Sequence, residues 1–303
     1  MNNLDYHIPV MLNEVLEYLN PKDDEIFVDC TFGAGGYARK ILEKANCKLI
    51  GIDRDESVKI FADDVKTKFG DRFEFYNDKY SNIEKILDNR KVDGIVLDVG
   101  VSSMQVDNCD RGFSFQKNSR LDMRMGNNSI SAYEIINNTP EEELANIIYN
   151  YGDEVKSRHI AKKIVELRKI KPIETTFELA NIVRSFYTGK KGKIDPATKT
   201  FQAIRIAVND ELNELRKILE ISKKVLNKDG RLVVVCFHSL EDKIVKDFVK
   251  QETNKGKKND KYSKNIIKAD FELLTKKAIT PNNREVQNNI RSRSAKLRAL
   301  KKC

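Results

Sequence analysis

Short apolar runs alternate with amphipathic stretches in the first and last thirds of this 303-residue chain. The apolar runs are rich in β-branched residues, and the stretches between them repeat with a helical period. This pattern is typical of a parallel sheet covered by helices on both faces. The predicted strands are 25–30, 48–52, 72–76, 92–98, 231–237, 271–274 and 295–300. The predicted helices between them are 36–45, 56–69, 80–87, 201–226 and 239–251. The sequence therefore predicts an α/β fold.

The middle of the chain has a different pattern. Residues 104–200 show no strand pattern and contain helical stretches at 139–149, 155–168 and 177–185. Thr139 is the expected N-cap of the first, because acidic residues follow it in the first turn. We therefore predict three parts: residues 1–103 and 201–303 as the two halves of one α/β domain, and 104–200 as an inserted all-helical substrate-recognition domain.

Composition narrows the class of protein. Hydrophobic residues make up 40% of the chain and charged residues 33%, enough for both a core and a polar surface. No run reaches the roughly 18 apolar residues of a membrane span, and the N-terminus lacks the features of a signal peptide. Five scattered cysteines without a Cys-x-x-Cys and three distant histidines give no pattern for a disulfide framework or a metal site. These features predict a cytoplasmic protein without metal or membrane, and they leave its oligomeric state open.

Positive charge is concentrated near the C-terminus. The net charge is +9, and residues 250–303 hold 16 Lys or Arg against 5 Asp or Glu. Such a segment is either a solvated, partly disordered tail or a surface that faces nucleic-acid phosphates. The lysine-rich stretch 253–264 is expected to be a flexible loop. Composition alone leaves both interpretations open.

A glycine-rich turn follows the first predicted strand. Residues 29–37 read DCTFGAGGY, and Gly33, Gly35 and Gly36 permit tight turning and close approach of a ligand. Asp53 ends the second strand, where a carboxylate accepts hydrogen bonds from both hydroxyls of an adenosine ribose. The alternative is a turn with purely structural glycines. A nicotinamide dinucleotide is disfavoured, because the glycine spacing differs from G-x-G-x-x-G and the Asp29 carboxylate suits an ammonium better than a pyrophosphate.

The loop after the fourth strand supplies candidate catalytic groups. Ligands bind outside the carboxyl ends of parallel strands, so Asp98, Ser102 and Ser103 are expected near the reacting centre. The glycine turn favours S-adenosylmethionine, a methyl donor, over a nicotinamide dinucleotide. Methyl transfer from this donor is an in-line displacement, so it depends chiefly on the alignment of donor and acceptor. If the acceptor is an exocyclic amine, a carboxylate or hydroxyl that accepts its N–H makes the nitrogen lone pair more available. His238, directly after the apolar strand 231–237, is a further candidate for moving the amine proton.

The chain resembles the bacterial ribosomal RNA small subunit methyltransferase H family from end to end. The matching segments are HIPVMLNEVL (7–16), DCTFGAGGY (29–37), GIDRD (51–55), LDVGVSSMQVD (97–107), RGFSF (111–115), LDMRM (121–125), FQAIRIAVNDEL (201–212), FHSLEDKIVK (237–246) and RSRSAKLRAL (291–300). The resemblance implies a class I, Rossmann-like S-adenosylmethionine methyltransferase fold with a helical insertion. It also implies methylation of cytidine N4 in the decoding region of 16S rRNA, within the small ribosomal subunit.

The resemblance also implies roles for individual residues. Those that would bind S-adenosyl-L-methionine are Gly35, Gly36 and Tyr37 at the methionine end, Asp53 at the ribose, Tyr80 at the adenine, and Asp98 and Gln105 completing the site. This chain departs from the family in having Tyr37 where His is frequent. It also has Met104, Arg120 and Ile290 where Pro is common, which loosens turns without removing a reacting group.

Other residues are candidates for holding RNA. Phe113 and Phe115 suit stacking on a splayed-out base, or else belong to a core beneath the insertion. Arg111, Arg120 and Arg124 suit phosphates, or else surface salt bridges. His7 is expected near the site and His159 at the surface. The cations expected to grip RNA without sequence specificity are Lys190, Lys191, Lys193 and those of the C-terminal tail.

Three other functions remain as alternatives. A DNA amino-methyltransferase faces the same chemistry, but such enzymes carry Pro-Pro-Tyr or Pro-Pro-Phe after the fourth strand, where this chain has Gly-Val-Ser-Ser (100–103). A non-catalytic RNA-binding assembly factor predicts a degraded donor turn, which is not observed. A nicotinamide oxidoreductase is disfavoured by the glycine spacing.

Overall fold

The computed structural model describes residues 9–127, 130–187, 194–253 and 269–303. It divides into two compact units, one of residues 1–100 and 212–303, and one of residues 101–211. The lysines 190, 191 and 193, His7, and most of the predicted loop 253–264 lie outside the described residues.

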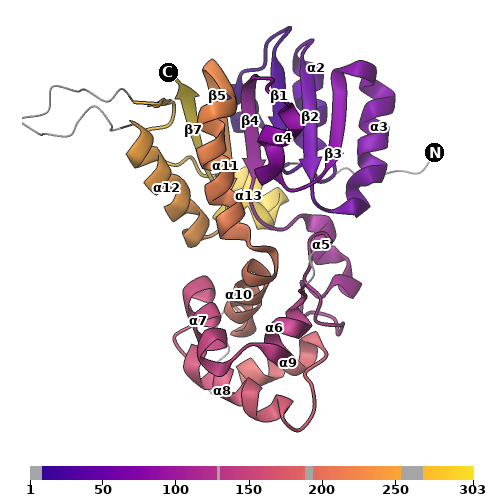
Figure 1. The fold of residues 1–303 in the computed structure, drawn as a ribbon, viewed down its shortest axis with the longest axis vertical. Helices are drawn as coiled ribbons and strands as arrows, with labels where there is room; N and C mark the ends of the chain where they lie inside the picture. Colours follow the sequence, from indigo (N-terminus) through magenta and orange to yellow (C-terminus); the bar gives the residue numbers. More distant parts are fainter. Residues whose placement is uncertain (1–8, 128–129, 188–193, 254–268) are drawn as a thin grey trace, which may run out of the picture. The chain divides into compact units, whose positions relative to one another are not determined.

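The first unit is built on a seven-stranded sheet with the order β3-β2-β1-β4-β5-β7-β6 (Figure 1). Its strands are β1 (Ile26–Asp29), β2 (Lys48–Asp53), β3 (Phe73–Asn77), β4 (Val92–Asp98), β5 (Leu226–Cys236), β6 (Phe271–Leu273) and β7 (Lys296–Lys302). The first five strands run parallel, whereas β7 is antiparallel to β5 and β6 is antiparallel to β7. All seven predicted strands are confirmed to within a few residues, with β5 beginning earlier than predicted.

Helices cover both faces of this sheet. They are α1 (Leu12–Leu19), α2 (Gly36–Lys44), α3 (Lys59–Phe69), α4 (Ile83–Leu87), α11 (Glu211–Val225), α12 (Ser239–Thr253) and α13 (Asn283–Asn288). Alternate strand residues face opposite ways. Val28 and Ile95 therefore join a core with Leu215 of α11, while α1 contacts β4, β5 and β7 and α2 contacts β2. The near-continuous apolar strands are explained by this double burial.

The second unit is helical. It contains α5 (Ser103–Asp107), α6 (Ala132–Asn138), α7 (Glu141–Gly152), α8 (Ser157–Arg168), α9 (Thr176–Arg184) and α10 (Ala197–Asn209). These helices share their own apolar core, which includes Leu144, Ile160, Leu179 and Ile204. None of the strands named in the described part of the chain falls within this unit.

Two local predictions are wrong. The helix predicted over 201–226 is two helices, because Asp210 adopts a left-handed conformation (φ 52°) and ends α10. A short polar side chain tolerates this conformation, which a helical period does not reveal. Thr139 is the C-cap of α6, and the N-cap of α7 is Pro140, although the acidic first turn of α7 is as predicted.

No helix in the described ranges is long and apolar enough to cross a membrane.

Candidate active site

The carboxyl ends of β1, β2, β4 and β5 meet at one edge of the sheet and bring the predicted acidic residues together. The loop after β1 is tied to both neighbouring strands, since the Phe32 N–H donates to Ile52 O (3.1 Å) and the Asp98 N–H donates to Thr31 Oγ1 (2.7 Å). The Val99 N–H donates to Val235 O (2.9 Å), which fixes the end of β4 beside β5. The edge is therefore a connected surface rather than four separate loops.

The glycine turn between β1 and α2 requires its glycines. Gly35 has φ 74°, and a Cβ there would lie 2.8 Å from the Phe32 ring. A Cβ on Gly36 would lie only 2.3 Å from Pro9 Cγ. The backbone of the turn is thus packed from behind by the chain's own residues. Any side chain would push it toward the carboxyl edge of the sheet, where a ligand binds.

Asp53 joins the glycine turn to the end of β2. Its Oδ2 accepts the Gly33 N–H (2.8 Å) and its Oδ1 accepts the Asp55 N–H (2.9 Å). Removal from water raises the pKa of Asp53 to about 6, although these two N–H groups lower it. Each carboxylate oxygen has a further lone pair after accepting one hydrogen bond. Asp53 is therefore able to accept two hydroxyl hydrogens from a ribose while it holds the turn.

Asp29 and Asp98 are carboxylates with unpartnered oxygens. Asp29 is fully buried, and its Oδ1 accepts the Thr31 N–H at 3.2 Å. Among the described residues, Asp29 Oδ2 and Asp98 Oδ1 are buried without a hydrogen-bond partner. Burial raises the pKa of Asp29 to about 7, and the charge of Asp53 adds to the rise. Burial, followed by the charges of Asp29 and Glu241, holds the pKa of Asp98 well above its usual range. Such crowded carboxylates favour a cationic ligand and oppose a pyrophosphate.

Glu241 is a member of this edge that the sequence analysis missed. It is fully buried on the first turn of α12, and its Oε2 accepts the N–H groups of Phe237 (2.8 Å) and His238 (3.2 Å). The helix α12 begins at Ser239, as predicted. The Asp242 N–H donates to His238 O, so His238 is its N-cap.

Glu241 also approaches the side chain of His238. Glu241 Oε1 lies 2.9 Å from His238 Nε2, and the imidazole is 12% exposed. Neither atom satisfies hydrogen-bond geometry, and His238 Nδ1 is also buried without a partner. The signal for Glu241 was present in the segment FHSLED, but a carboxylate at the third position of a helix is ordinarily read as a cap.

Three of the residues predicted to bind the donor make contacts within the protein. Tyr37 is 3% exposed, and its hydroxyl donates to the carbonyl of Val10. Gln105 and Ser102, in the helical unit, form a reciprocal capping box at the start of α5, in which the Gln105 N–H donates to Ser102 Oγ (3.2 Å). Tyr80 begins the turn after β3 and packs partly against the sheet core. The Tyr37 hydroxyl hydrogen is thus already donated, whereas Ser102 Oγ accepts a hydrogen bond and keeps its own hydrogen available.

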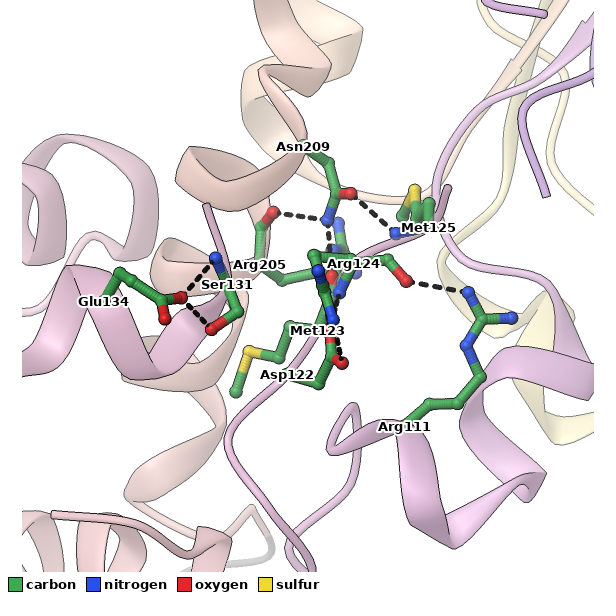
Figure 2. A network of polar contacts seen from close by, with 9 residues as sticks. All are labelled: Arg111, Asp122, Met123, Arg124, Met125, Ser131, Glu134, Arg205 and Asn209. Carbon is green, nitrogen blue, oxygen red and sulfur yellow. Dashed lines mark hydrogen bonds and ion pairs between the residues drawn. The ribbon is translucent and has the colours of Figure 1, made fainter. Parts of the chain in front are cut away.

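The arginine cluster of the helical unit is organised by an internal network (Figure 2). Arg124 makes two hydrogen bonds to Asp122, of 2.7 and 2.8 Å, and Arg111 Nη2 donates to the carbonyl of Arg124 (2.7 Å). Asn209 of α10 accepts the Met125 N–H (2.8 Å) and donates to Met123 O (2.7 Å), which holds the segment against the helices. The salt-bridge interpretation of Arg124 is therefore realised in the structure.

The aromatic residues of the helical unit pack on its core. The centroids of the Phe115 and Phe201 rings are 4.8 Å apart, and the Arg184 guanidinium lies over the Phe115 ring, 5.5 Å from its centroid. Phe113 is partly buried against the same core. Arg120 is exposed, and His159 is exposed on α8, as predicted for His159.

Part of the C-terminal positive charge is neutralised locally. Lys296 and Arg298 of β7 both pair with Asp242 (3.1 and 2.9 Å), and Lys302 pairs with Asp270 (3.3 Å). The segment 296–302 is thus a strand of the sheet as well as a basic segment. Its cations Lys296, Arg298 and Lys302 are paired with carboxylates and do not form a surface that is available to phosphates.

Comparison with known proteins identifies the family. A model of the MraW methylase family matches residues 5–303. The chain belongs to this family. It is 54% identical over 299 residues to the ribosomal RNA small subunit methyltransferase H of Rickettsia massiliae, covering 97% of each chain. It is 53% identical over 300 residues to the protein of that name from Rickettsia bellii, covering 98% of each chain.

Solved structures similar to this MraW methylase include an rRNA methylase from Streptococcus thermophilus, with 11% identity and a TM-score of 0.43 over 96% of this chain and 93% of that chain. Another is TrmN from Thermus thermophilus, with 8% identity and a TM-score of 0.45 over 97% of this chain and 48% of that chain.

Family membership and the sheet order confirm the predicted class I methyltransferase fold and methyltransferase activity. S-adenosyl-L-methionine is the methyl donor, as predicted. The residues at the sheet edge fit this donor, because buried Asp29 has an oxygen without a partner, suited to an ammonium, and Asp53 has lone pairs for ribose hydroxyls.

Proposed function

We propose that this MraW methylase transfers a methyl group to N4 of a cytidine in the decoding region of 16S rRNA, within the small ribosomal subunit. The curated relatives that cover nearly the whole chain are named for the small subunit rRNA. The observation that carries the chemistry is the row of carboxylates Asp29, Asp53, Asp98 and Glu241 at one edge of the sheet, with unpartnered oxygens on three of them. A ribosomal substrate also implies a cytoplasmic location.

Each group at the edge has a distinct task in this proposal. S-adenosyl-L-methionine supplies a methyl group activated on a positive sulfonium. The backbone of Gly33, Gly35 and Gly36 and the Asp29 carboxylate bind its methionine end, and Asp53 holds the ribose. Tyr37 supports the turn from behind, through its hydrogen bond to Val10.

The acceptor side rests on Asp98. A cation bound nearby favours the ionised form of this carboxylate, which then accepts an N–H of the amine. Accepting that hydrogen makes the nitrogen lone pair more available for attack and aligns it. Ser102, four residues along the chain, and His238 at the end of β5 are the other proposed catalytic residues, and Tyr80 and Gln105 complete the donor site.

The helical unit is proposed to recognise the substrate. Its basic, aromatic stretch 111–124 holds Arg111, Arg120, Phe113 and Phe115, residue types that grip phosphates and stack on bases. Arg111 is prearranged by its hydrogen bond to the carbonyl of Arg124, which lowers the entropy lost when it binds phosphate.

The test is to incubate the protein with labelled S-adenosyl-L-methionine and small ribosomal subunits that lack the modification, and to map the label by mass spectrometry. Label on cytidine N4 at one decoding-region position is expected. Subunits that already carry the modification and the variant Asp98→Asn are the controls. Label on another atom or on DNA only, or RNA binding without any label, would refute the proposal.

A further inference from the structure

Glu241 has one oxygen whose position is explained by the fold and one whose position is not. Oε2 accepts two backbone N–H groups at the β5–α12 junction, which is a complete structural role. Oε1 has no hydrogen bond although the side chain is fully buried, and it lies 2.9 Å from His238 Nε2. Leaving a buried carboxylate oxygen unsatisfied is costly. The fold therefore gives no account of why Glu rather than Gln stands here.

The short contact favours one position of the imidazole proton. A carboxylate oxygen carries lone pairs only, and so does an unprotonated ring nitrogen. Two such atoms repel at 2.9 Å, whereas the positive end of an N–H dipole is attracted to the carboxylate even though the pair does not meet hydrogen-bond geometry, so the contact favours the proton on His238 Nε2. In the neutral ring Nδ1 is then bare, and it has no hydrogen-bond partner among the described residues. Glu241 thus leaves His238 with one nitrogen able to receive a proton.

We propose that Glu241 is a positioning residue that holds His238 with Nε2 protonated, so that Nδ1 takes the proton lost by the methylated amine. This inference rests on the proposed function for its acceptor. The new N4–CH3 bond forms as the CH3–S bond breaks, and the donor becomes a neutral thioether. The nitrogen, which began with two hydrogens, releases one as a proton to His238 Nδ1. The resulting imidazolium lies beside the Glu241 carboxylate, and its proton later passes to water.

Asp98 is the competing proton acceptor. The geometry favours Asp98 as the acceptor of the amine hydrogen bond and His238 as the group that receives the released proton. Asp98 lies among carboxylates, with Asp29 on β1 and Glu241 on α12 both acting on it. It is suited to accept an amine hydrogen bond once a cation is bound. Among the described residues named at this edge, His238 is the one that becomes a cation on gaining a proton, and it already has an anion at 2.9 Å.

The first experiment needs no substrate. The chain has three histidines, so ¹⁵N-labelled histidine gives a simple spectrum of ring nitrogens, in which His238→Gln identifies the His238 signals. For the full-length protein at neutral pH, we expect a protonated Nε2 and a bare Nδ1. The opposite tautomer would overturn the inference, whatever RNA the protein methylates.

The second experiment is a double-mutant cycle on methyl transfer to the small subunit. Glu241→Gln keeps an oxygen for the two backbone N–H groups but removes the charge. We expect kcat to fall roughly 100-fold, within the range for acid–base groups, while KM and donor affinity by calorimetry stay within about twofold. In the His238→Gln background the same change should have no further effect. Independent, multiplying losses, or a parallel loss of donor affinity, would show a merely structural role.

Glu252→Gln is the matched control. Glu252 is also fully buried on α12, near its other end, and pairs with Lys223 at 3.4 Å. This variant should keep the wild-type kcat. If the wild type labels no cytidine N4, the proposed function fails, and the tautomer measurement still decides the Glu241–His238 arrangement.

Discussion

Replacing Asp29 by Asn should stabilise the protein without donor at neutral pH, by an amount that grows with pH. Burial raises the pKa of Asp29 from 3.8 to about 7. Well below pH 3.8 the side chain is neutral in both the folded and unfolded states. As pH rises toward 7 it ionises in the unfolded state first, so the free energy of unfolding falls by 1.36 kcal/mol per pH unit, about 4 kcal/mol in total.

Asn is the matched replacement, because its oxygen still accepts the Thr31 N–H that Asp29 Oδ1 accepts at 3.2 Å. Asp53 and Asp98 contribute pH dependence of the same sign. The informative quantity is therefore the difference between variant and wild type, which contains the titration of Asp29 and the loss of its repulsion with Asp53 and Asp98, both of the same sign. Between pH 5 and pH 8 this difference should change by about 3 kcal/mol in favour of the variant.

The assay is urea unfolding at a series of pH values, followed by circular dichroism because the chain has no Trp. Asp63→Asn, which removes an exposed carboxylate on α3, should run parallel to the wild type. The Asn variant should also bind S-adenosyl-L-methionine more weakly. Parallel curves for Asp29→Asn and wild type would refute the reasoning, since they would mean that burying this charge has no energetic consequence.

Four other predictions follow from the structure. Asp53→Ala should weaken donor binding by about 1.5–3 kcal/mol, roughly 10- to 150-fold, the typical worth of hydrogen bonds to a charged group; unchanged affinity by calorimetry would contradict the ribose role. Gly36→Ala should destabilise the protein by about 1–3 kcal/mol in urea, because the new Cβ would overlap Pro9 Cγ at 2.3 Å; a variant as stable as wild type would exclude that contact. Asn209→Ala should cost about 2–3 kcal/mol by leaving buried backbone groups without partners, and exposed Asn150→Ala on α7 should cost almost nothing. Replacing the tail lysines Lys255, Lys257, Lys258 and Lys261 by Gln should lower RNA affinity. The slope of log affinity against log salt should fall by up to about 0.9 per lost phosphate contact. An unchanged slope would mean that these lysines do not contact RNA phosphates.

The elements that the sequence predicted best are those determined by local pattern. β1, β2 and β4 are runs of apolar residues buried on both faces, and such runs have few other stable outcomes. The helix break at Asp210 was missed because a single residue in the left-handed conformation does not interrupt the spacing of apolar residues along the sequence. α1 was also missed, although it packs on the sheet, because its 8 residues give only about two turns in which a helical period can be recognised.

The candidate site was predictable where charged residues lie at the ends of strands. It was not predictable where side chains contact other parts of the protein instead of the ligand. Asp29, Asp53 and Asp98 come together because parallel strands end at one edge. Tyr37 follows the glycines and points instead to Val10, which depends on the path of the N-terminal segment. Glu241 was missed because the sequence shows only a carboxylate at a capping position. The structure shows that one oxygen of Glu241 accepts backbone N–H groups while the other lies beside the His238 ring.

The glycine turn is held by both ends of the chain. Pro9 packs against Gly36, the Val10 carbonyl receives the Tyr37 hydroxyl, and the Met11 N–H donates to Glu285 of α13 (2.6 Å). During synthesis residues 9–11 emerge early, whereas Glu285, 274 residues beyond Met11, emerges much later. A nascent chain therefore lacks this part of the brace behind its donor turn until it has been synthesised beyond Glu285.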